Sequence, residues 1–439
     1  MHPVEIVKTV HAMRGVAPAL AASSLEARNQ ALDNIAEGLK NHAQAIFSAN
    51  RADCSNAQAV GIAPTILHRL KYDEKRLQES LDQLEELKGL EDPIGRLEME
   101  RKLDDDLVLR RVSCPIGVLG VIFEARPDAL IQIGSLCLKS GNVAILKGGS
   151  EAKRTNEALF EIVHDAYVSA GLPELSLSLA QTHAEIDELL ACDKDVDLLI
   201  PRGSNAFVRY IMDHTKIPVM GHAEGVCHIY VHKDADPKRA ISIVVDSKTQ
   251  YPAVCNAAET LLIDRAVAPE LLPKIAQALA QRGARLRGTQ EVVHLLKRTP
   301  DIPAVELMGD NEFHTEYGDL VMSCKIVENI EEAVQHINRW SSHHTDAIVT
   351  EDECAAQFFM RFVDSADVYH NCSTRFADGF RYGFGAEVGI ATGKLQARGP
   401  VGLEGLESYK YLLEGNGNIV ASYASGKRHF HFKDIKPLY

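Results

Sequence analysis

From about residue 115 onwards, short apolar runs alternate with amphipathic helical patterns, and this alternation restricts the folds that the chain can adopt. IGVLGVIFE is followed by PDALIQIGSLCLKSG, NVAILKG by SEAKRTNEALFEIVHDAYVSAG, and VDLLIPRG by SNAFVRYIMDHT. Such alternation is typical of βαβ units, in which a parallel sheet is covered by helices on both faces. The sequence therefore predicts an α/β fold with a doubly wound parallel sheet of the nucleotide-binding type.

A second alternating series begins after about residue 230 and predicts a second α/β domain. Its apolar runs are TLLIDRAV, DAIVTED and DVYHNCS, and its helical patterns include ELLPKIAQALAQRG and ECAAQFFMRFV. A chain of 439 residues is also too long for one ordinary core, so two or three domains are expected.

Three parts of the chain fit neither series. The first ninety residues have helical patterns, with a capping box predicted at Ser23 and Glu26 and leucines recurring on one face of KRLQESLDQLEEL. The segments 97–114 and 409–424 are polar and strand-like, and EGNGN within the second predicts a hairpin turn. Exposed strand edges seldom stay unpaired, so we expect these strands to form a subunit contact.

The charge and the cysteines narrow the class of protein. A net charge of −14 argues against nucleic acid or an anionic membrane as the main partner. The nine cysteines are scattered and form no C-x-x-C pair, which favours reduced thiols over disulfides or zinc. MHPVEIVKTVHAMRG lacks the apolar core of a signal peptide, and no run reaches membrane-spanning length. We therefore expect a soluble cytoplasmic protein.

Two predicted strand-to-helix junctions have the composition of phosphate-binding turns. In LKGGSEAK a strand ends at Lys147, the chain turns at Gly149, and a helix opens at Ser150. In PRGSN, Gly203 and Ser204 precede another helix. Glycine allows close backbone approach, a helix N-terminus offers free N–H groups, and lysine supplies a positive charge. Both are equally readable as ordinary turns with serine N-caps, although two in one sheet favour phosphate or dinucleotide binding.

Other motifs are rejected. GFGAEVG has the wrong spacing for a dinucleotide fingerprint, and GIATGKL is one residue short of a phosphate loop. His343 and His344, like His429 and His431, are interpreted as solvated surface histidines because no cysteine or carboxylate completes a ligand set. We therefore predict no metal site.

Cys255 lies between a proline turn and an apolar run in TQYPAVCNAAETLLI. A free cysteine is most often a small buried hydrophobic residue, so packing is the first interpretation. The alternative is a nucleophile at a domain junction that faces a cofactor held by the other domain. The local sequence leaves both open.

Several segments together resemble one known family. SKTQYPAVCNAAETLLI, CPIGVLGVIFEARPDALIQIG, PRGSNAFVRYI, FHTEYGDLVMSCKIV and ATGKLQARGPVGLEGL are similar to γ-glutamyl phosphate reductases, also called glutamate-5-semialdehyde dehydrogenases. That family belongs to the aldehyde dehydrogenase superfamily and acts in proline biosynthesis. The resemblance runs over nearly the whole chain in the right order, and no amino-acid kinase domain precedes it, as expected for a stand-alone reductase.

The resemblance implies an NADPH-dependent reduction of L-glutamyl 5-phosphate to L-glutamate 5-semialdehyde with release of phosphate. Cys255 falls on the family's catalytic cysteine. Its thiolate attacks the acyl phosphate, a thioester forms, and hydride transfer gives a thiohemiacetal that collapses to the aldehyde. The Cys255 backbone N–H and the nearby amide of Asn256 are the expected donors to the oxyanion.

Two departures from the wider superfamily accompany this resemblance. Hydrolytic members carry a glutamate in E-L-G-G-K that activates water, whereas this chain reads GHAEGVC, with His222 near that place and Glu224 shifted. The loss of this glutamate supports the phosphate-releasing reaction. Those members also carry W-N-F-P where this chain reads FEARP, and Arg126 is expected to meet the substrate's phosphate or carboxylate.

The resemblance also implies a cofactor site for NADPH/NADP. Lys147 and Ser150 are placed near the adenine ribose and its 2′-phosphate. Gly203 and Ser204 are placed by the pyrophosphate, and Glu316 in TEYGD near the nicotinamide ribose. Arginine residues suit oxyanions, and further substrate candidates are Arg375 and Arg398.

The expected architecture is an aldehyde-dehydrogenase-like fold in three parts. Residues 1–96 and 115–230 form the NADP-binding domain, and residues 231–405 form the catalytic domain with the nucleophilic cysteine. Residues 97–114 and 406–439 supply a small β extension for oligomerisation, so a homo-oligomer is expected, at least a dimer. Transient association with glutamate 5-kinase is a further expectation.

Two other functions remain open at this point. One is a different acylating or hydrolytic aldehyde dehydrogenase, which phosphate dependence would distinguish. The other is a non-catalytic binding or assembly protein, in which Cys255 would be unreactive.

Overall fold

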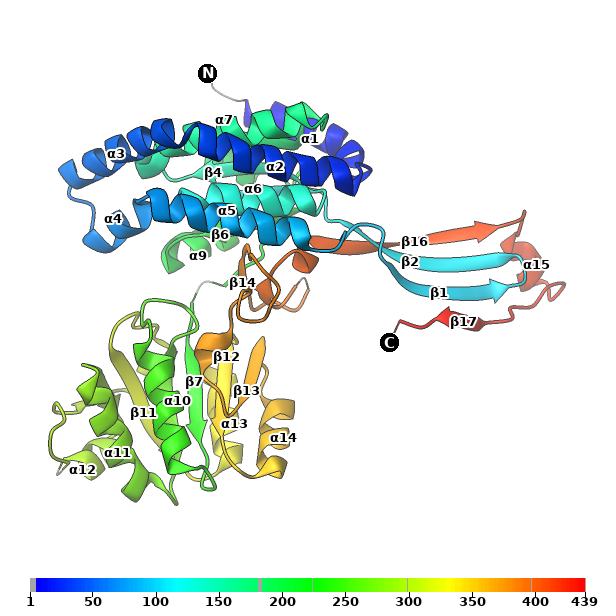
Figure 1. Cartoon of the computed structure of the whole chain (residues 1–439). Helices are drawn as coiled ribbons and strands as arrows, with labels where there is room; N and C mark the ends of the chain where they lie inside the picture. Colours follow the sequence, from blue (N-terminus) through cyan, green and yellow to red (C-terminus); the bar gives the residue numbers. More distant parts are fainter. Residues whose placement is uncertain (1–4, 181–183, 223, 298, 396, 439) are drawn as a thin grey trace. The chain divides into compact units, whose positions relative to one another are not determined.

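The computed structural model describes residues 5–180, 184–222, 224–297, 299–395 and 397–438, which divide into two compact units (Figure 1). Unit 1 comprises Met1–Met220, Phe384–Val388 and Val401–Tyr439, and unit 2 comprises Gly221–Gly383 and Gly389–Pro400. The division after Met220 precedes CHIYV, an apolar run that forms the first strand of unit 2 and that the alternation analysis did not include. The chain therefore leaves unit 1 and returns to it twice.

Unit 1 is built around a four-stranded parallel sheet with the strand order β5-β4-β3-β6. Every side chain of β3 and β4 is buried, as expected for strands covered by helices on both faces. Figure 1 shows α2, α3, α5 and α7 packed around this sheet. The strands are β3 (Val118–Phe123), β4 (Val143–Gly148), β5 (Leu177–Ala180) and β6 (Leu198–Arg202). The helices are α1 (Ile6–Ala21), α2 (Leu25–Asn41), α3 (Ala43–Ala59), α4 (Pro64–Leu70), α5 (Glu74–Gly89), α6 (Asp128–Lys139), α7 (Lys153–Ser169), α8 (Ala184–Leu190) and α9 (Asn205–Asp213).

The predicted capping box at the start of α2 is wrong by one residue. Ser24 caps the helix, because its hydroxyl oxygen accepts a hydrogen bond from the Ala27 N–H at 3.2 Å. Ser23 belongs to the end of α1, where its hydroxyl donates to the Leu20 carbonyl at 2.6 Å. Of two adjacent serines, one can cap the start of a helix while the other bonds to the end of the preceding helix. The sequence alone does not show which serine has which role.

A second sheet in unit 1 has the antiparallel order β16-β2-β1-β17. It combines the two strand-like segments, since β1 (Leu97–Asp104) and β2 (Leu107–Pro115) form a hairpin. β16 (Glu407–Gly415) pairs with β2 along its whole length, from Glu407 opposite Pro115 to Gly415 opposite Leu107. β17 (Lys433–Lys436) pairs with β1 on the other edge.

The hairpin predicted at EGNGN is wrong. After β16 the chain forms a short helix, α15 (Val420–Ala424), and returns as β17 on the far edge of the sheet. Acidic side chains at the β1–β2 turn hold this return segment. The Tyr423 hydroxyl donates to Asp104 at 2.9 Å, and the Arg428 guanidinium binds both Asp104 and Asp106. These long-range bonds outweigh the local preference of the turn.

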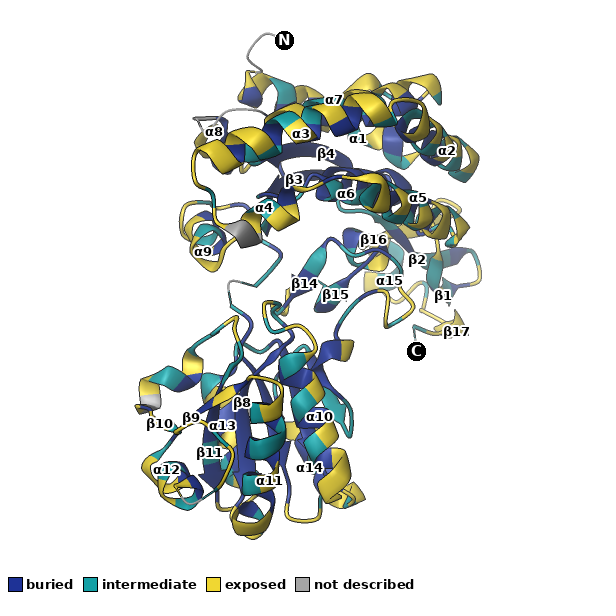
Figure 2. Ribbon diagram, turned by 60° about the vertical axis from the view of Figure 1, so that its left-hand side comes forward, coloured by how far each residue is buried: buried dark blue, intermediate teal, exposed yellow. Residues whose placement is uncertain are grey.

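Unit 2 contains a seven-stranded parallel sheet with the order β10-β9-β11-β8-β7-β12-β13, as far as the described residues show. Figure 2 shows the central strands as buried ribbons between helices. The strands are β7 (Cys227–Val231), β8 (Ala258–Asp264), β9 (Arg285–Gly288), β10 (Glu306–Leu307), β11 (Val321–Val327), β12 (Thr345–Val349) and β13 (Asp367–His370). The helices are α10 (Pro237–Thr249), α11 (Ala268–Gln281), α12 (Gln290–Leu296), α13 (Ile330–Trp340) and α14 (Glu353–Phe362).

Two apolar cores cover the two faces of this sheet. The larger packs α10 and α11 against strands that include β8 and β11, and the smaller packs α13 and α14. The last segment of unit 2 begins with the short strand β14 (Gly389–Ala391). Its end lies within a second short strand, β15 (Gly399–Val401). The predicted α/β class with doubly wound parallel sheets is confirmed. None of the helices in the described part of the chain is both long and apolar enough to cross a membrane.

Candidate active site

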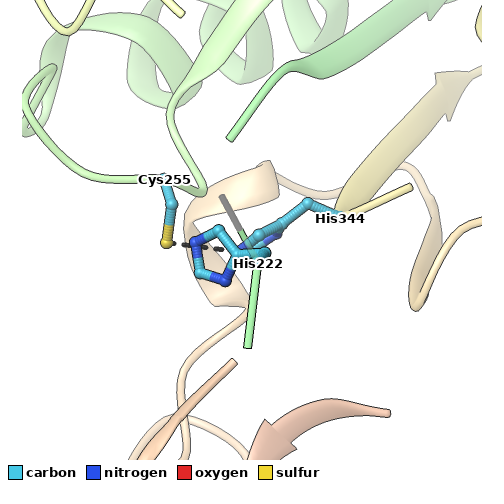
Figure 3. A group of neighbouring side chains, drawn as sticks. All are labelled: His222, Cys255 and His344. Atoms are coloured by element: carbon cyan, nitrogen blue, oxygen red, sulfur yellow. Dashed lines mark hydrogen bonds between the residues drawn. The ribbon is translucent and has the colours of Figure 1, made fainter. Parts of the chain in front are cut away.

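Three side chains of unit 2 gather at the amino ends of three neighbouring strands. His222 lies in the segment that enters β7, Cys255 lies in the turn before β8, and His344 immediately precedes β12. These strands are adjacent in the order β8-β7-β12, so the loops that enter them meet at one edge of the sheet. Figure 3 shows both imidazole rings turned toward the Cys255 sulfur.

The cluster is compact. His344 Nε2 lies 3.2 Å from Cys255 Sγ, and one ligand-type atom of each residue lies within 4.8 Å of the others. The two rings pack edge to face with centroids 4.7 Å apart. A thiol in contact with two imidazoles is the arrangement expected of an activated nucleophile.

Each imidazole is fixed through its other nitrogen. His222 Nδ1 lies 2.7 Å from the Ile390 carbonyl oxygen, to which it donates. His344 Nδ1 lies 2.7 Å from the Thr345 hydroxyl oxygen. Because the δ nitrogens are engaged, the ε nitrogen of each ring is the one available to the sulfur.

The charges at this cluster favour an ion pair. Burial alone would raise the pKa of the Cys255 thiol, but His344 and His222 more than offset it and hold that pKa well below its ordinary value. Burial alone would lower the pKa of His222, but the Cys255 thiolate, the Ile390 carbonyl and Glu316 raise it to about 9. The surroundings therefore favour the thiolate form of Cys255 and the imidazolium form of His222.

The interpretation of His344 as a solvated surface histidine is wrong. Its side chain is fully buried, and Cys255 supplies the partner that the sequence did not show. The residue immediately precedes β12, whose side chains are all buried, so it lies beside the start of a core strand. His343 differs, because its ring bonds to the Asp364 carbonyl and its backbone has a φ of 59°. The apolar residues of DAIVTED, which begin at Ala347, were the nearest available signal of burial.

Gly225 is required for the backbone approach beside the nucleophile. A Cβ atom at this position would lie 2.3 Å from the Cys255 carbonyl oxygen and 2.4 Å from its Cα. The backbone at Gly225 therefore passes directly over the Cys255 turn, with no room for a side chain at this position.

Asn256 anchors the same turn. It is 4% exposed, its side-chain amide donates to the Ala377 carbonyl at 2.7 Å, and its own carbonyl accepts from the Thr374 hydroxyl at 2.7 Å. These bonds fix the turn that presents Cys255. They also engage the amide that the sequence analysis assigned to the oxyanion, and that role stays a prediction.

The two candidate substrate arginines of unit 2 have different surroundings. Arg375 is 8% exposed, its Nε donates to Gln250 Oε1 at 3.0 Å, and its guanidinium interacts electrostatically with Cys255. Burial lowers the pKa of Arg375 below its ordinary value. Arg398 is tied to Asp364, with contacts of 3.1 and 3.2 Å to its side chain and carbonyl. Arg375 is thus the arginine that shares the electrostatic environment of the nucleophile.

A buried ion pair supports the loop that carries Glu316. Lys248 Nζ lies 2.6 Å from Glu259 Oε2, and both side chains are buried. Burial raises the pKa of Glu259 to about 7, although Lys248 opposes this rise. The other Glu259 oxygen accepts from the Gly318 N–H at 3.3 Å, and Glu316 contributes to the raised pKa of His222. The predicted ribose-binding residue therefore belongs to the electrostatic surroundings of the cluster.

In unit 1 the predicted cofactor residues lie at the carboxyl ends of the parallel strands. The strand order reverses between β3 and β6, and such a switch point is where open α/β sheets bind ligands. Here the Ser204 N–H, at the start of α9, donates to Glu124 Oε2 at 2.9 Å. A Cβ on Gly203 would lie 2.4 Å from the same oxygen. The backbone N–H at this helix start therefore binds a carboxylate oxygen.

The junction after β4 is similar. Lys147 is 2% exposed, its ammonium donates to the Gly148 carbonyl at 2.6 Å, and burial lowers its pKa. Gly149 and Ser150 follow, and Ser150 opens a short 3-10 helix. A Cβ on Gly149 would lie 2.1 Å from Glu151 Oε1, which accepts from the Ala125 N–H at 2.5 Å. Neither Glu124 nor Glu151 was predicted from the sequence as part of these junctions.

Arg126 follows an unusual backbone conformation in unit 1. Ala125 has a φ of 44°, in the left-handed region that residues other than glycine rarely adopt. Such strain tends to occur at functional sites. Arg126 is half-buried after this turn.

Known proteins identify the family. Residues 2–290 match the aldehyde dehydrogenase family model. Over 425 residues the chain is 51% identical to the γ-glutamyl phosphate reductase of Cyanothece sp., with 96% of each chain covered. The crystal structure of γ-glutamyl phosphate reductase from Thermotoga maritima is 34% identical, with 95% of this chain and 100% of that chain covered and a TM-score of 0.91. Glyceraldehyde-3-phosphate dehydrogenase from Methanocaldococcus jannaschii, complexed with NADP, shares the fold at 17% identity, with 94% of each chain covered and a TM-score of 0.65.

The predicted resemblance and the aldehyde-dehydrogenase-like fold are thus confirmed. The chain belongs to the aldehyde dehydrogenase family and, within it, to the γ-glutamyl phosphate reductases.

Proposed function

We propose that the protein reduces L-glutamyl 5-phosphate to L-glutamate 5-semialdehyde and releases phosphate, a step of proline biosynthesis. The observation that carries this proposal is the Cys255 thiolate held between His222 and His344, together with relatives named for this reaction. An acyl phosphate is an electrophile that a thiolate attacks readily.

The residues of the cluster account for each step on the protein. Cys255 Sγ forms a bond to the acyl carbon and the bond to phosphate breaks, which leaves a thioester. The His222 imidazolium stabilises the thiolate before the attack, and it carries a proton that the departing phosphate can take. A nicotinamide cofactor held near Glu316 would supply the hydride that reduces the thioester. The resulting thiohemiacetal releases the aldehyde when Cys255 leaves again as a thiolate beside His344.

The same cluster explains why the thioester passes to hydride rather than to water. A general base for hydrolysis must accept a proton at the working pH. His222 stands near the place where hydrolytic members carry their glutamate, so an imidazole replaces the carboxylate that activates water in those members. This replacement disfavours the hydrolytic alternative.

We propose NADPH as the nicotinamide cofactor, with Lys147 and Ser150 near the adenine ribose and its 2′-phosphate and Gly203 and Ser204 beside the pyrophosphate. The fit is supported by the Ser204 N–H, which already binds a carboxylate oxygen at the switch point of the sheet. A pyrophosphate oxygen would take that oxygen's place. Glu316 would hold the nicotinamide ribose in unit 2.

We propose Arg375 as the main residue that binds the anionic groups of the substrate. Its side chain is buried and interacts electrostatically with Cys255. Arg126 is a second candidate, supported by the strained turn before it. Arg398 keeps its ion pair with Asp364, so we give it a supporting role in substrate binding.

We also propose a cytoplasmic homo-oligomer, transiently associated with glutamate 5-kinase. Alternate residues of β16 present an exposed apolar face, with Tyr409, Tyr411 and Leu413 exposed by 46%, 56% and 57%. A second copy of the chain would cover it. The cytoplasmic assignment is supported by the nine cysteines, which are all free thiols.

The test is the reverse reaction, followed as NADP⁺ reduction with glutamate semialdehyde, with and without inorganic phosphate. Phosphate-dependent reduction in the wild type, and its loss in Cys255→Ser, are expected. Turnover without phosphate would replace the proposal with hydrolytic aldehyde oxidation. Failure of the folded wild type to turn over would favour a non-catalytic member.

A further inference from the structure

The cluster of Cys255, His222 and His344 combines ligand types that zinc prefers. Zn²⁺ in proteins is bound by cysteine sulfur and histidine nitrogen, and sites with three protein ligands keep a fourth position for water. Here one sulfur and two imidazole nitrogens lie within 4.8 Å of one another, on three separate loops. The cluster therefore offers a complete three-ligand set.

The distances suit a tetrahedral ion. With Zn–S near ~2.3 Å and Zn–N near ~2.1 Å, a sulfur and a nitrogen ligand are separated by about 3.6 Å. Cys255 Sγ and His344 Nε2 are 3.2 Å apart, and no pair in the cluster exceeds 4.8 Å. Small side-chain rotations, without backbone movement, would bring all three atoms onto one ion.

The outer bonds of the rings are those of metal-binding histidines. Such histidines normally bond through the second ring nitrogen to a carbonyl or another oxygen, and this bond fixes the ring. His222 has it with the Ile390 carbonyl and His344 with the Thr345 hydroxyl, each at 2.7 Å. The ligands are thus oriented before a metal arrives.

We propose that His222, Cys255 and His344 form a binding site for Zn²⁺, and that zinc bound there reversibly inhibits the enzyme. Zinc would occupy the sulfur that must attack the substrate and both imidazoles that flank it. The binding stands on the cluster alone, whereas the inhibition rests on the proposed function.

Binding is tested with Co²⁺ as a spectroscopic probe in tag-free protein, with a phosphine reductant. A cobalt–thiolate charge-transfer band is expected at one equivalent per chain, and one equivalent of Zn²⁺ should abolish it. Cys255→Ser should lack the band, and His222→Ala and His344→Ala should each weaken binding by more than about tenfold, since even an outer partner is worth about that much. The control is Cys354→Ser with His294→Ala, two exposed positions outside the cluster, which should bind as the wild type does.

Activity is measured in parallel on the same samples. NADP⁺ reduction should fall at the zinc concentration that displaces cobalt, and EDTA should restore it. If the wild type binds cobalt but turns over no substrate even without zinc, the metal site stands and the proposed function fails. If the band is missing in the wild type, or if it persists in folded Cys255→Ser, the zinc site is refuted. Circular dichroism establishes that each variant is folded.

Discussion

Replacing His222 by alanine should make the Cys255 thiol harder to ionise. The rise of the His222 pKa from 6.5 to about 9 corresponds to roughly 3 kcal/mol of extra stabilisation of the imidazolium, to which the Cys255 thiolate is the first favourable contributor. Coupling between two sites is mutual, so the thiolate loses a comparable amount when His222 is removed. Burial, which opposes ionisation of Cys255, remains in the variant.

This loss sets the size of the effect on reactivity. An energy of about 2 to 3 kcal/mol moves the midpoint of thiol ionisation upward by about two pH units. Below both midpoints, the thiolate fraction falls about 100-fold. A more basic thiolate is intrinsically more nucleophilic, by roughly tenfold over this range. At pH values below both midpoints, the net expectation for His222→Ala is alkylation about tenfold slower than in the wild type, and this difference should narrow as the pH rises through the midpoints.

The assay is the rate of Cys255 alkylation by iodoacetamide as a function of pH, quantified by mass spectrometry of the Cys255 peptide. The wild type should react through a midpoint well below that of an ordinary thiol, and His222→Ala through a higher one. His294→Ala, an exposed histidine on α12, is the matched control and should follow the wild type. Superimposed profiles of His222→Ala and the wild type would refute the ion pair with His222.

Three further predictions concern stability and assembly. Gly225→Ala should destabilise the fold by about 1 to 3 kcal/mol and abolish Cys255 alkylation, because the new Cβ would lie 2.3 Å from the Cys255 carbonyl oxygen. Calorimetry measures the stability, and the same alkylation assay measures the reactivity. An unchanged melting temperature would contradict this prediction. Lys248→Met should cost about 3 to 5 kcal/mol in urea unfolding by leaving Glu259 without its partner, and adding Glu259→Met should recover much of the loss. Tyr411→Glu should lower the mass measured by light scattering toward that of one chain, whereas an unaltered mass would remove β16 from the subunit contact.

Strands and helices with strong local signals could be predicted in both parallel sheets, whereas the strand CHIYV was missed. VLGVIF and VAILKG read as buried strands, and the structure buries every side chain in them. The hairpin at EGNGN failed because its outcome depends on Asp104 and Asp106, which lie about three hundred residues earlier in the chain. Turn chemistry describes four or five residues and carries no information about such partners.

The candidate site was predictable only in part, for the same reason. Cys255 could be singled out, and His222 was noticed through the family's missing glutamate. His344 was misread, because the step that joins it to Cys255 is the spatial order β8-β7-β12. Strand order in a parallel sheet follows from packing across the whole unit, so no window of the sequence contains it.

During synthesis on the ribosome, β2 is made long before β16, the strand that pairs with it. β2 is complete at Pro115, but the strand that covers its edge begins only at Glu407. At about 5 to 20 residues per second, the β1–β2 hairpin waits roughly 15 to 60 seconds with that edge open. Open edges invite pairing with other nascent chains, and charged residues discourage it. In the folded protein, Arg110 in β2 binds Glu414 and Arg111 stacks on Tyr409. During the wait for β16, we expect the charges of these two arginines to discourage such pairing.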